Sequence, residues 1–147
     1  MRARISTIIK TNEDRIWDEL QKVSSLLYVA SPILQFKPQK DHPLPERWTI
    51  GKEYKLRLSL LGIIPLGDHF ITLVALDRKE RTIISNEHGT LTNAWNHTIR
   101  LEAIDDQTTE YTDEIDIHAG ILTCSIWLFS YVFYKHRQRR WKKLLDS

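Results

Sequence analysis

From residue 52 to residue 118 the chain is a series of strand-like segments with very short connections. These predicted strands are 52–61, 68–77, 81–88, 94–104 and 108–118, and three to six residues separate each from the next. A parallel pair of strands needs a crossover of about a dozen residues or more, so these neighbours must pair antiparallel. The sequence therefore predicts an antiparallel meander.

The remaining segments supply helices that can cover this sheet. We expect a strand at 3–10, a helix from the Thr11-x-x-Asp14 motif, a helix at 24–30 ended by Ser31-Pro32, a strand at 33–37 and a long helix at 121–145. A sheet with one apolar face must bury it, and only the last helix is long enough. We predict one α+β domain over residues 1–147, in which about seven antiparallel strands curve around the C-terminal helix.

The composition is that of an ordinary globular domain. With 41% hydrophobic and 27% charged residues, the 147-residue chain is too apolar for a disordered protein. Cys124 is the only cysteine, so no internal disulfide can form, and we expect a cytoplasmic protein with this thiol buried and inert. No apolar run follows the basic N-terminus, so we expect no signal peptide.

Positive charge is concentrated at the C-terminal end. Residues 135–147 carry six Lys or Arg and one acid, whereas residues 1–134 carry fifteen bases and eighteen acids. A nucleic-acid-binding protein usually spreads positive charge over a folded face, so we expect no nucleic-acid partner. We interpret the basic run as the solvated end of a helix, where cations complement the helix dipole.

Two polar residues interrupt the apolar inner rows of the last two strands. Along 94–104 the inner row is Trp95, His97, Ile99 and Leu101, and along 108–118 it is Tyr111, Asp113, Ile115 and Ile117. We expect His97 and Asp113 to be direct or diagonal cross-strand neighbours. Three interpretations stay open: a structural pair that fixes strand register, a contact that orients a ligand, and a catalytic pair with His97 as general base.

A curved sheet closing on one helix leaves room at its open end, and we predict a ligand cavity there. On the helix, Leu122, Ile126, Phe129, Phe133 and His136 recur at helical spacing and should face the sheet. Segment 68–77 is apolar on both rows, so its inner row stays open. The predicted ligand-binding residues are Tyr54, Leu56, Leu58, Trp95, His97, Ile99, Tyr111, Asp113, Ile115, Leu122, Ile126, Phe129 and Phe133.

The other side of the last helix is also apolar, through Trp127, Leu128, Tyr131 and Tyr134. The apolar stretch is about sixteen residues, shorter than the roughly 20 needed to span a bilayer, so we expect no transmembrane helix. A homodimer through the Trp127 and Tyr131 face, cover by the N-terminal helices, and contact of the basic flank with a membrane surface are the alternatives.

Three stretches resemble the START-like superfamily, also called SRPBCC or helix-grip proteins, and within it the polyketide cyclase/dehydrase-like branch. Residues 93–102 resemble its W-x-H-x-x-x-x-E pattern, residues 109–115 its T-x-x-x-D-x-(V/I) pattern, and residues 134–141 the basic end of its terminal helix. The resemblance implies a helix-grip fold. It leaves function open, because the superfamily includes lipid carriers, receptors, cyclases and dehydratases.

We therefore predict a module that sequesters or transports a small, mostly hydrophobic molecule such as a lipid, polyketide or aromatic metabolite. One alternative is a cyclase or dehydratase that uses His97 and Asp113, and another is an interaction or membrane-surface protein that acts through the C-terminal helix. The six histidines lack metal-ligand spacing and no Gly-rich phosphate loop is present, so we expect neither a metal nor a cofactor.

Overall fold

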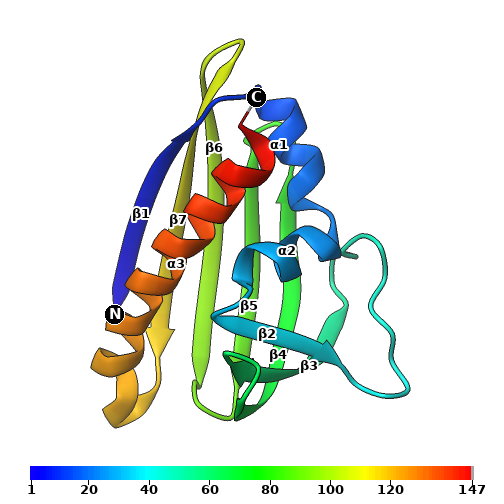
Figure 1. The fold of residues 1–147 in the computed structure, drawn as a ribbon, viewed down its shortest axis with the longest axis vertical. Helices are drawn as coiled ribbons and strands as arrows, with labels where there is room; N and C mark the ends of the chain where they lie inside the picture. The colour runs from blue at the N-terminus through cyan, green and yellow to red at the C-terminus, as the bar shows by residue number, and fades with distance from the viewer. Residues whose placement is uncertain (147) are drawn as a thin grey trace.

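The computed structural model describes residues 1–146, which form a seven-stranded antiparallel sheet and three α-helices (Figure 1). The strand order is β1-β7-β6-β5-β4-β3-β2, so the meander from β2 to β7 is closed by β1 at its far edge. The elements are β1 (Arg2–Ile9), α1 (Glu13–Leu20), α2 (Val23–Ala30), β2 (Leu34–Pro38), β3 (Glu53–Leu60), β4 (Ile64–Asp77), β5 (Thr82–Gly89), β6 (Ala94–Asp105), β7 (Thr108–His118), the 3-10 turn η1 (Gly120–Leu122) and α3 (Thr123–Leu145). The predicted α+β helix-grip fold is confirmed.

Helix α3 runs diagonally across the inner face of the sheet, and α1 and α2 lie beside it (Figure 1). It packs on β1 and β7 and against α2, so it covers one side of the sheet more closely than the other. Strands β3 to β5 extend beyond the helix, and β2, which pairs with β3 at the edge of the sheet, crosses in front of them below α2 (Figure 1). This unequal cover leaves the interior space described below.

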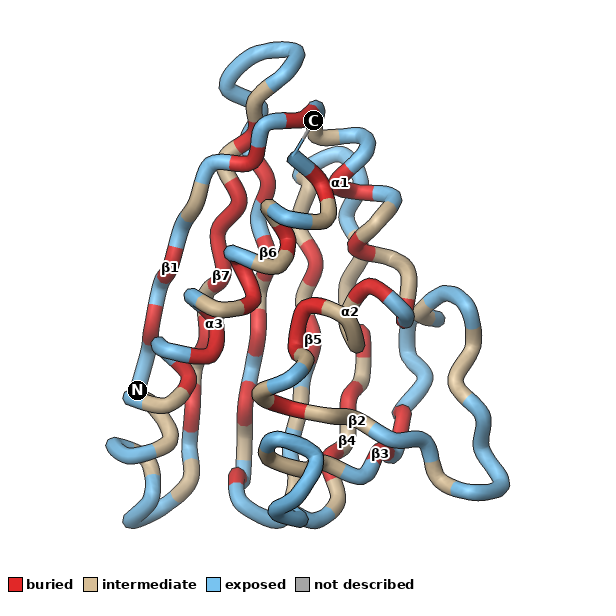
Figure 2. Tube along the Cα trace, viewed as in Figure 1, coloured by how far each residue is buried: buried red, intermediate tan, exposed pale blue. Residues whose placement is uncertain are grey.

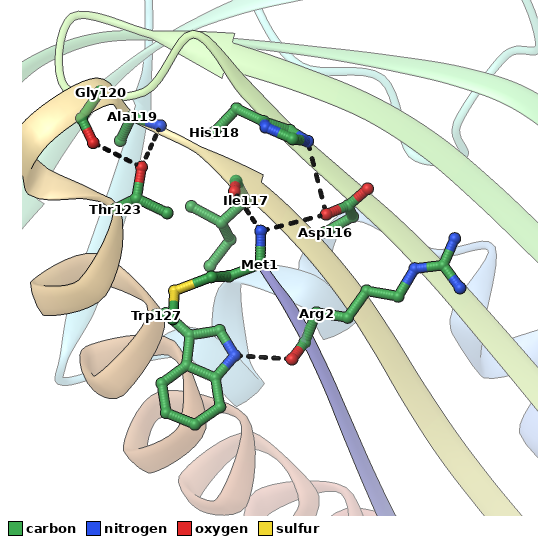
Figure 3. Close-up of polar contacts among 9 residues, drawn as sticks. All are labelled: Met1, Arg2, Asp116, Ile117, His118, Ala119, Gly120, Thr123 and Trp127. Carbon is green, nitrogen blue, oxygen red and sulfur yellow. Dashed lines mark hydrogen bonds and ion pairs between the residues drawn. The ribbon is translucent and has the colours of Figure 1, made fainter.

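A short polar network fixes the start of α3 (Figure 3). The Trp127 indole N–H donates to the carbonyl oxygen of Arg2 at 2.7 Å. The Thr123 hydroxyl oxygen accepts from the Ala119 N–H at 3.0 Å, and the hydroxyl donates to the Gly120 carbonyl at 2.8 Å. Gly120 has φ +59°, a conformation that glycine adopts without strain. The chain thus turns from β7 into α3 within a few residues.

Inner rows of β6 and β7 follow the predicted parity. Trp95, His97, Ile99 and Leu101 on β6, and Tyr111, Asp113, Ile115 and Ile117 on β7, are all buried. In the register His97 lies opposite Ile115 and Ile99 opposite Asp113, so His97 and Asp113 are diagonal neighbours.

Strand β4 changes its inner row in mid-strand. His69, Ile71 and Leu73 are buried, Val74 is exposed, and the pairing with β5 shifts between Leu73 and residue 75. After this bulge the even-numbered Leu76 turns inward and packs against the core. Both rows of this segment are apolar because each faces inward along part of the strand. The strand also begins at Ile64, four residues before the predicted position.

Burial along α3 runs against its hydropathy. The first half of α3 is the more apolar, yet only Ser130 and Phe133 are buried there, whereas Tyr134, Arg137, Gln138, Trp141 and Leu145 are buried from the middle of the helix onward (Figure 2). Two expectations were wrong here: Leu122 is exposed in η1 instead of facing the sheet, and Cys124 is exposed instead of buried.

At the other end of the domain, Asn12 rather than Thr11 caps α1 through a bond from the Arg15 N–H.

Candidate functional site

A pocket of about 280 Å³ lies between α3 and the inner face of strands β3 to β6. Side chains of α1, α2 and β2 complete its walls, and most of the lining side chains are apolar. The buried apolar residues form two separate clusters, one around Trp17, Tyr111 and Trp141 and the other around Trp95 and Phe133. Both clusters contribute to the pocket lining, so the pocket occupies the place where a continuous core would otherwise lie.

Seven of the thirteen residues predicted to bind ligand line this pocket. They are Leu58, Trp95, His97, Ile99, Ile126, Phe129 and Phe133. The other six, Tyr54, Leu56, Tyr111, Asp113, Ile115 and Leu122, do not line it. Because α3 lies directly on β1 and β7, the inner side chains of β7 pack beneath the helix and away from the open space.

The remaining exceptions also have local causes. Tyr54 packs edge-on against Trp48, and its phenol oxygen accepts from the Thr49 N–H at 3.0 Å, which holds it beneath the 48–52 loop. Leu56 is fully buried within the sheet. The expected wall of Tyr54, Leu56 and Leu58 is therefore reduced to Leu58.

A row of polar side chains crosses the otherwise apolar pocket wall, beginning on β4 and β5. His69 Nε2 lies 2.9 Å from Glu87 Oε1, and the Ser85 hydroxyl donates to Glu87 Oε2 at 2.8 Å. Burial raises the pKa of the Glu87 carboxyl, but the bonds from His69 and Ser85 and the charge of nearby His97 outweigh it, so the pKa lies below its ordinary value. Glu87 is therefore ionised at neutral pH.

The row continues on β6, β7 and α3. Ser85 pairs directly with His97 across the strands, and His97 Nε2 lies 2.6 Å from Asp113 Oδ1. Asp113 also accepts from the Tyr111 hydroxyl at 3.0 Å and from Gln138 Nε2 at 3.0 Å. The same Gln138 nitrogen donates to the Ile5 carbonyl at 2.7 Å, so Asp113 joins β6, β7, α3 and β1.

Arg137 is the charged residue of the site that lacks a protein acceptor. Its side chain lines the pocket and is only 4% exposed, yet no hydrogen bond or ion pair joins it to any of residues 1–146. Its guanidinium carbon lies 4.9 Å from the centre of the Tyr134 ring. Burial lowers the pKa of the guanidinium, but the oxygens of Tyr134, Tyr111 and Asp113 more than offset this, so the pKa rises above its ordinary value.

Tyr134 lies between His97 and Arg137 and also lines the pocket. Its ring centre is 4.9 Å from that of His97, and its phenol oxygen accepts from the Trp95 indole N–H at 2.9 Å. Burial raises the pKa of the phenol well above its ordinary value, so the group keeps its proton. No acceptor for that proton lies among the described residues.

Sequence reasoning found one of the polar groups that line the pocket, His97, and missed His69, Glu87, Tyr134 and Arg137. The alternation of Ile83, Ser85 and Glu87 was a usable signal for Glu87, since Ile83 is an evident core residue. The sequence also showed no sign of a second acid–base pair beside His97 and Asp113. The structure brings His69 and Glu87 together as a second histidine–carboxylate pair in the same pocket. Within residues 1–146 no three His, Cys, Asp or Glu side chains gather as a metal site.

Glu87→Gln is expected to lower the free energy of unfolding at pH 7 by roughly 1–3 kcal/mol, because bonds to an ionised acceptor become bonds to a neutral one. Since the folded pKa lies below the ordinary 4.5, the carboxylate contributes fully above that value and loses its contribution as the pH falls through the folded pKa. Urea unfolding between pH 7 and pH 3 should show the difference from wild type shrinking as acid is added. The exposed Glu102→Gln serves as control, and a constant difference across the range would contradict this account.

Comparison with known proteins places this geometry in a structural class. No curated protein sequence matches the chain. Among solved structures, norcoclaurine synthase from Thalictrum flavum superposes with a TM-score of 0.70 at 11% identity, covering 98% of this chain and 85% of the synthase chain. A START superfamily protein from Mycobacterium smegmatis gives 0.68 at 8% identity over 98% and 96% of the two chains. A major latex-like protein from Panax ginseng gives 0.68 at 12% over 99% and 97%.

These similarities establish the fold and, at such low identity, the fold alone. A family model, described as a domain of unknown function (DUF8410), matches residues 7–145, which is nearly the whole chain. The sequence resemblance to START-like proteins and the superposition on a START superfamily structure agree with each other. The chain belongs to the DUF8410 family and has the START-like helix-grip fold.

Proposed function

We propose that this protein binds a small, mostly apolar molecule in the pocket between α3 and strands β3 to β6. The observation that carries the proposal is the 280 Å³ space itself, which separates two apolar clusters where a domain without a ligand would pack them together. Its volume is near the roughly 300 Å³ at the lower end of small-molecule sites. The ligand contacts we propose are the seven predicted residues that line the pocket.

The structural relatives lend support of a general kind. The norcoclaurine synthase structure contains dopamine and hydroxybenzaldehyde, which are small aromatic molecules. An aromatic or short aliphatic ligand is consistent with a pocket of this size, and removal of its apolar surface from water would contribute roughly 25 cal/mol per Å² before association costs. His97 and Ser85, which lie side by side on the wall, would orient a polar group of the ligand.

A fluorescent probe that brightens in apolar surroundings, N-phenyl-1-naphthylamine, tests the proposal because it is neutral and needs no charged partner. The double variant Leu58→Trp with Ile126→Trp narrows the pocket from two sides, and we expect it to weaken probe binding at least tenfold. The matched control, Arg57→Trp with Ser125→Trp, adds the same two indoles at exposed neighbouring positions and should change the affinity less than twofold. Wild-type protein that leaves the probe dark, or a narrowed variant that binds it equally well, would refute the proposal.

An enzymatic role in the same pocket is the alternative that the geometry allows. His97 Nε2 is engaged by Asp113, and its other ring nitrogen has no hydrogen-bond partner within residues 1–146, as a general base would require. His69 and Glu87 add a second ionisable pair. An enzymatic role requires a substrate that the pocket converts, whereas ligand binding requires only the pocket itself. Ligand binding is therefore the function we propose.

A second candidate function uses the outer face of α3. Leu128, Tyr131 and Val132 are exposed on one side of the helix, and Lys135 follows them one turn later. None of the helices in residues 1–146 is long and apolar enough to cross a membrane. We propose that this face contacts an anionic lipid surface, because exposed apolar residues beside a cation are typical of interfacial helices; a homodimer through Trp127 and Tyr131 is the competing interpretation.

Flotation with vesicles tests the surface contact. Wild-type protein should float with vesicles containing phosphatidylserine and much less with pure phosphatidylcholine, and the variant Leu128→Glu with Val132→Glu should stay at the bottom in both cases. Equal flotation of wild type and variant would contradict the membrane contact. A concentration-dependent dimer that the same variant dissociates, without any flotation, would favour the homodimer.

A further inference from the structure

Arg137 is a buried cation for which residues 1–146 provide no hydrogen-bond acceptor. A buried guanidinium carries five N–H donors and a full charge, and removing it from water is costly unless acceptors replace the water. Here the side chain is 4% exposed, its Nε has no acceptor, and no carboxylate of residues 1–146 forms an ion pair with it. Among the described cations, no other combines this degree of burial with the absence of an anionic partner.

The nearby acids are already committed to other donors. Asp113 accepts from His97, Tyr111 and Gln138, and Glu87 is held by His69 and Ser85. These carboxylates favour the charged form of Arg137 from a distance without bonding to it. The N–H groups of the guanidinium are therefore available to donate hydrogen bonds at the pocket wall.

Tyr134 adds a second donor at the same place. Its phenol oxygen accepts from Trp95, which leaves its own O–H without an acceptor among residues 1–146. Its ring lies against Arg137, and both side chains line the pocket. A planar guanidinium next to a phenol O–H is a donor arrangement suited to a carboxylate, which accepts two parallel bonds from arginine.

We propose that the ligand is an amphipathic carboxylic acid whose carboxylate is bound by Arg137 and Tyr134 and whose apolar body fills the pocket. This inference rests on the proposed function and adds to it the chemical class of the ligand. The apolar walls alone would favour an alcohol, an amine or a hydrocarbon as readily as an acid. Arg137 makes the distinction, because an amine would place a second cation beside it and an alcohol would leave its charge unpaired.

Three eight-carbon probes test the proposal by calorimetry at pH 7.5: octanoate, 1-octanol and octylamine. Wild-type protein should bind octanoate at least tenfold more tightly than 1-octanol and bind octylamine least. Arg137→Met keeps much of the side-chain volume, and we expect it to bind octanoate and 1-octanol within twofold of each other. Arg57→Met, at an exposed position, should retain the wild-type preference.

Equal affinity of wild type for octanoate and 1-octanol, or an unchanged preference in Arg137→Met, would overturn the carboxylate assignment. The proposed function would still stand if N-phenyl-1-naphthylamine binds. If that probe stays dark, the proposed function falls and the carboxylate assignment falls with it. Should Arg137→Met fail to fold, the assigned Nε–H resonance of Arg137 in ¹⁵N-labelled wild type decides. It should shift with octanoate and stay in place with 1-octanol, and the reverse pattern or no shift would refute the contact.

Discussion

Asp113→Ala is expected to lower the free energy of unfolding by about 3–5 kcal/mol, among the largest effects of any single substitution in this chain. The carboxylate is fully buried and accepts hydrogen bonds from His97, Tyr111 and Gln138. Its removal leaves His97 Nε2 and the Tyr111 hydroxyl without their acceptor, leaves Gln138 Nε2 with only the Ile5 carbonyl, and also creates a small void. Urea unfolding at pH 7, followed by circular dichroism, measures the loss.

Two further variants separate the structural role of Asp113 from a role in ligand binding. Asp113→Asn keeps the shape and one acceptor oxygen, so it should lose less, on the order of 1–3 kcal/mol. His97→Ala leaves Asp113 with two of its three donors and should cost less than Asp113→Ala. If His97→Ala proves as costly as Asp113→Ala, or if Asp113→Ala loses less than about 1 kcal/mol, Asp113 does not join the four elements as described.

The difference expected between the His97 and Asp113 variants bears on the three interpretations of this pair, which are a structural pair, a contact that orients a ligand, and a catalytic pair. His97 lines the pocket, whereas Asp113 lies beneath α3 and does not reach the pocket. Asp113 thus holds His97 from behind, and of the two residues only His97 borders the pocket in which we propose that a ligand binds. We expect His97→Ala to act mainly on the affinity for the fluorescent probe, and Asp113→Ala to act mainly on the free energy of unfolding.

The sequence predicted the antiparallel meander and the inner rows of β6 and β7 because these strands alternate cleanly between polar and apolar residues. It could not settle β4, and the physical reason is the bulge near Val74, which exchanges the two rows. Outward Phe70 adds to the ambiguity, because it stacks on His88 at 4.7 Å and lies under Lys55 at 5.8 Å. Because such contacts place large apolar side chains on the outer face, the outer row of a strand can resemble a core row in the sequence.

Arg137 was missed for a different reason. The basic run of residues 135–143 looks like a solvated helix end, and three of its six cations, Lys135, Arg139 and Lys143, are exposed as that interpretation requires. Which of them turns inward depends on how α3 crosses the sheet, and the crossing is fixed by contacts with β1, β7 and α2 far away in the sequence. A local pattern cannot carry that information, and the same long-range packing exposes the apolar start of the helix.

Trp141→Ala is the second substitution with a large expected effect, a loss of about 3–5 kcal/mol in the free energy of unfolding. The indole is 1% exposed, belongs to the cluster that contains Tyr111 and Leu145, and borders the pocket. Its N–H has no acceptor, so packing rather than hydrogen bonding accounts for its contribution. Trp141→Phe, which removes the N–H and retains a ring, should therefore lose only about 1–2 kcal/mol.

The void left by Trp141→Ala would join the existing pocket, and this gives the prediction a second measurement. Apolar cavities of this kind bind small aromatic molecules, so added indole should raise the melting temperature of Trp141→Ala by several degrees and that of wild type much less. Rescue would show that the lost stability is lost packing at the pocket wall. If the variant is as stable as wild type, or if indole stabilises both proteins equally, Trp141 does not fill the space between the apolar cluster and the pocket.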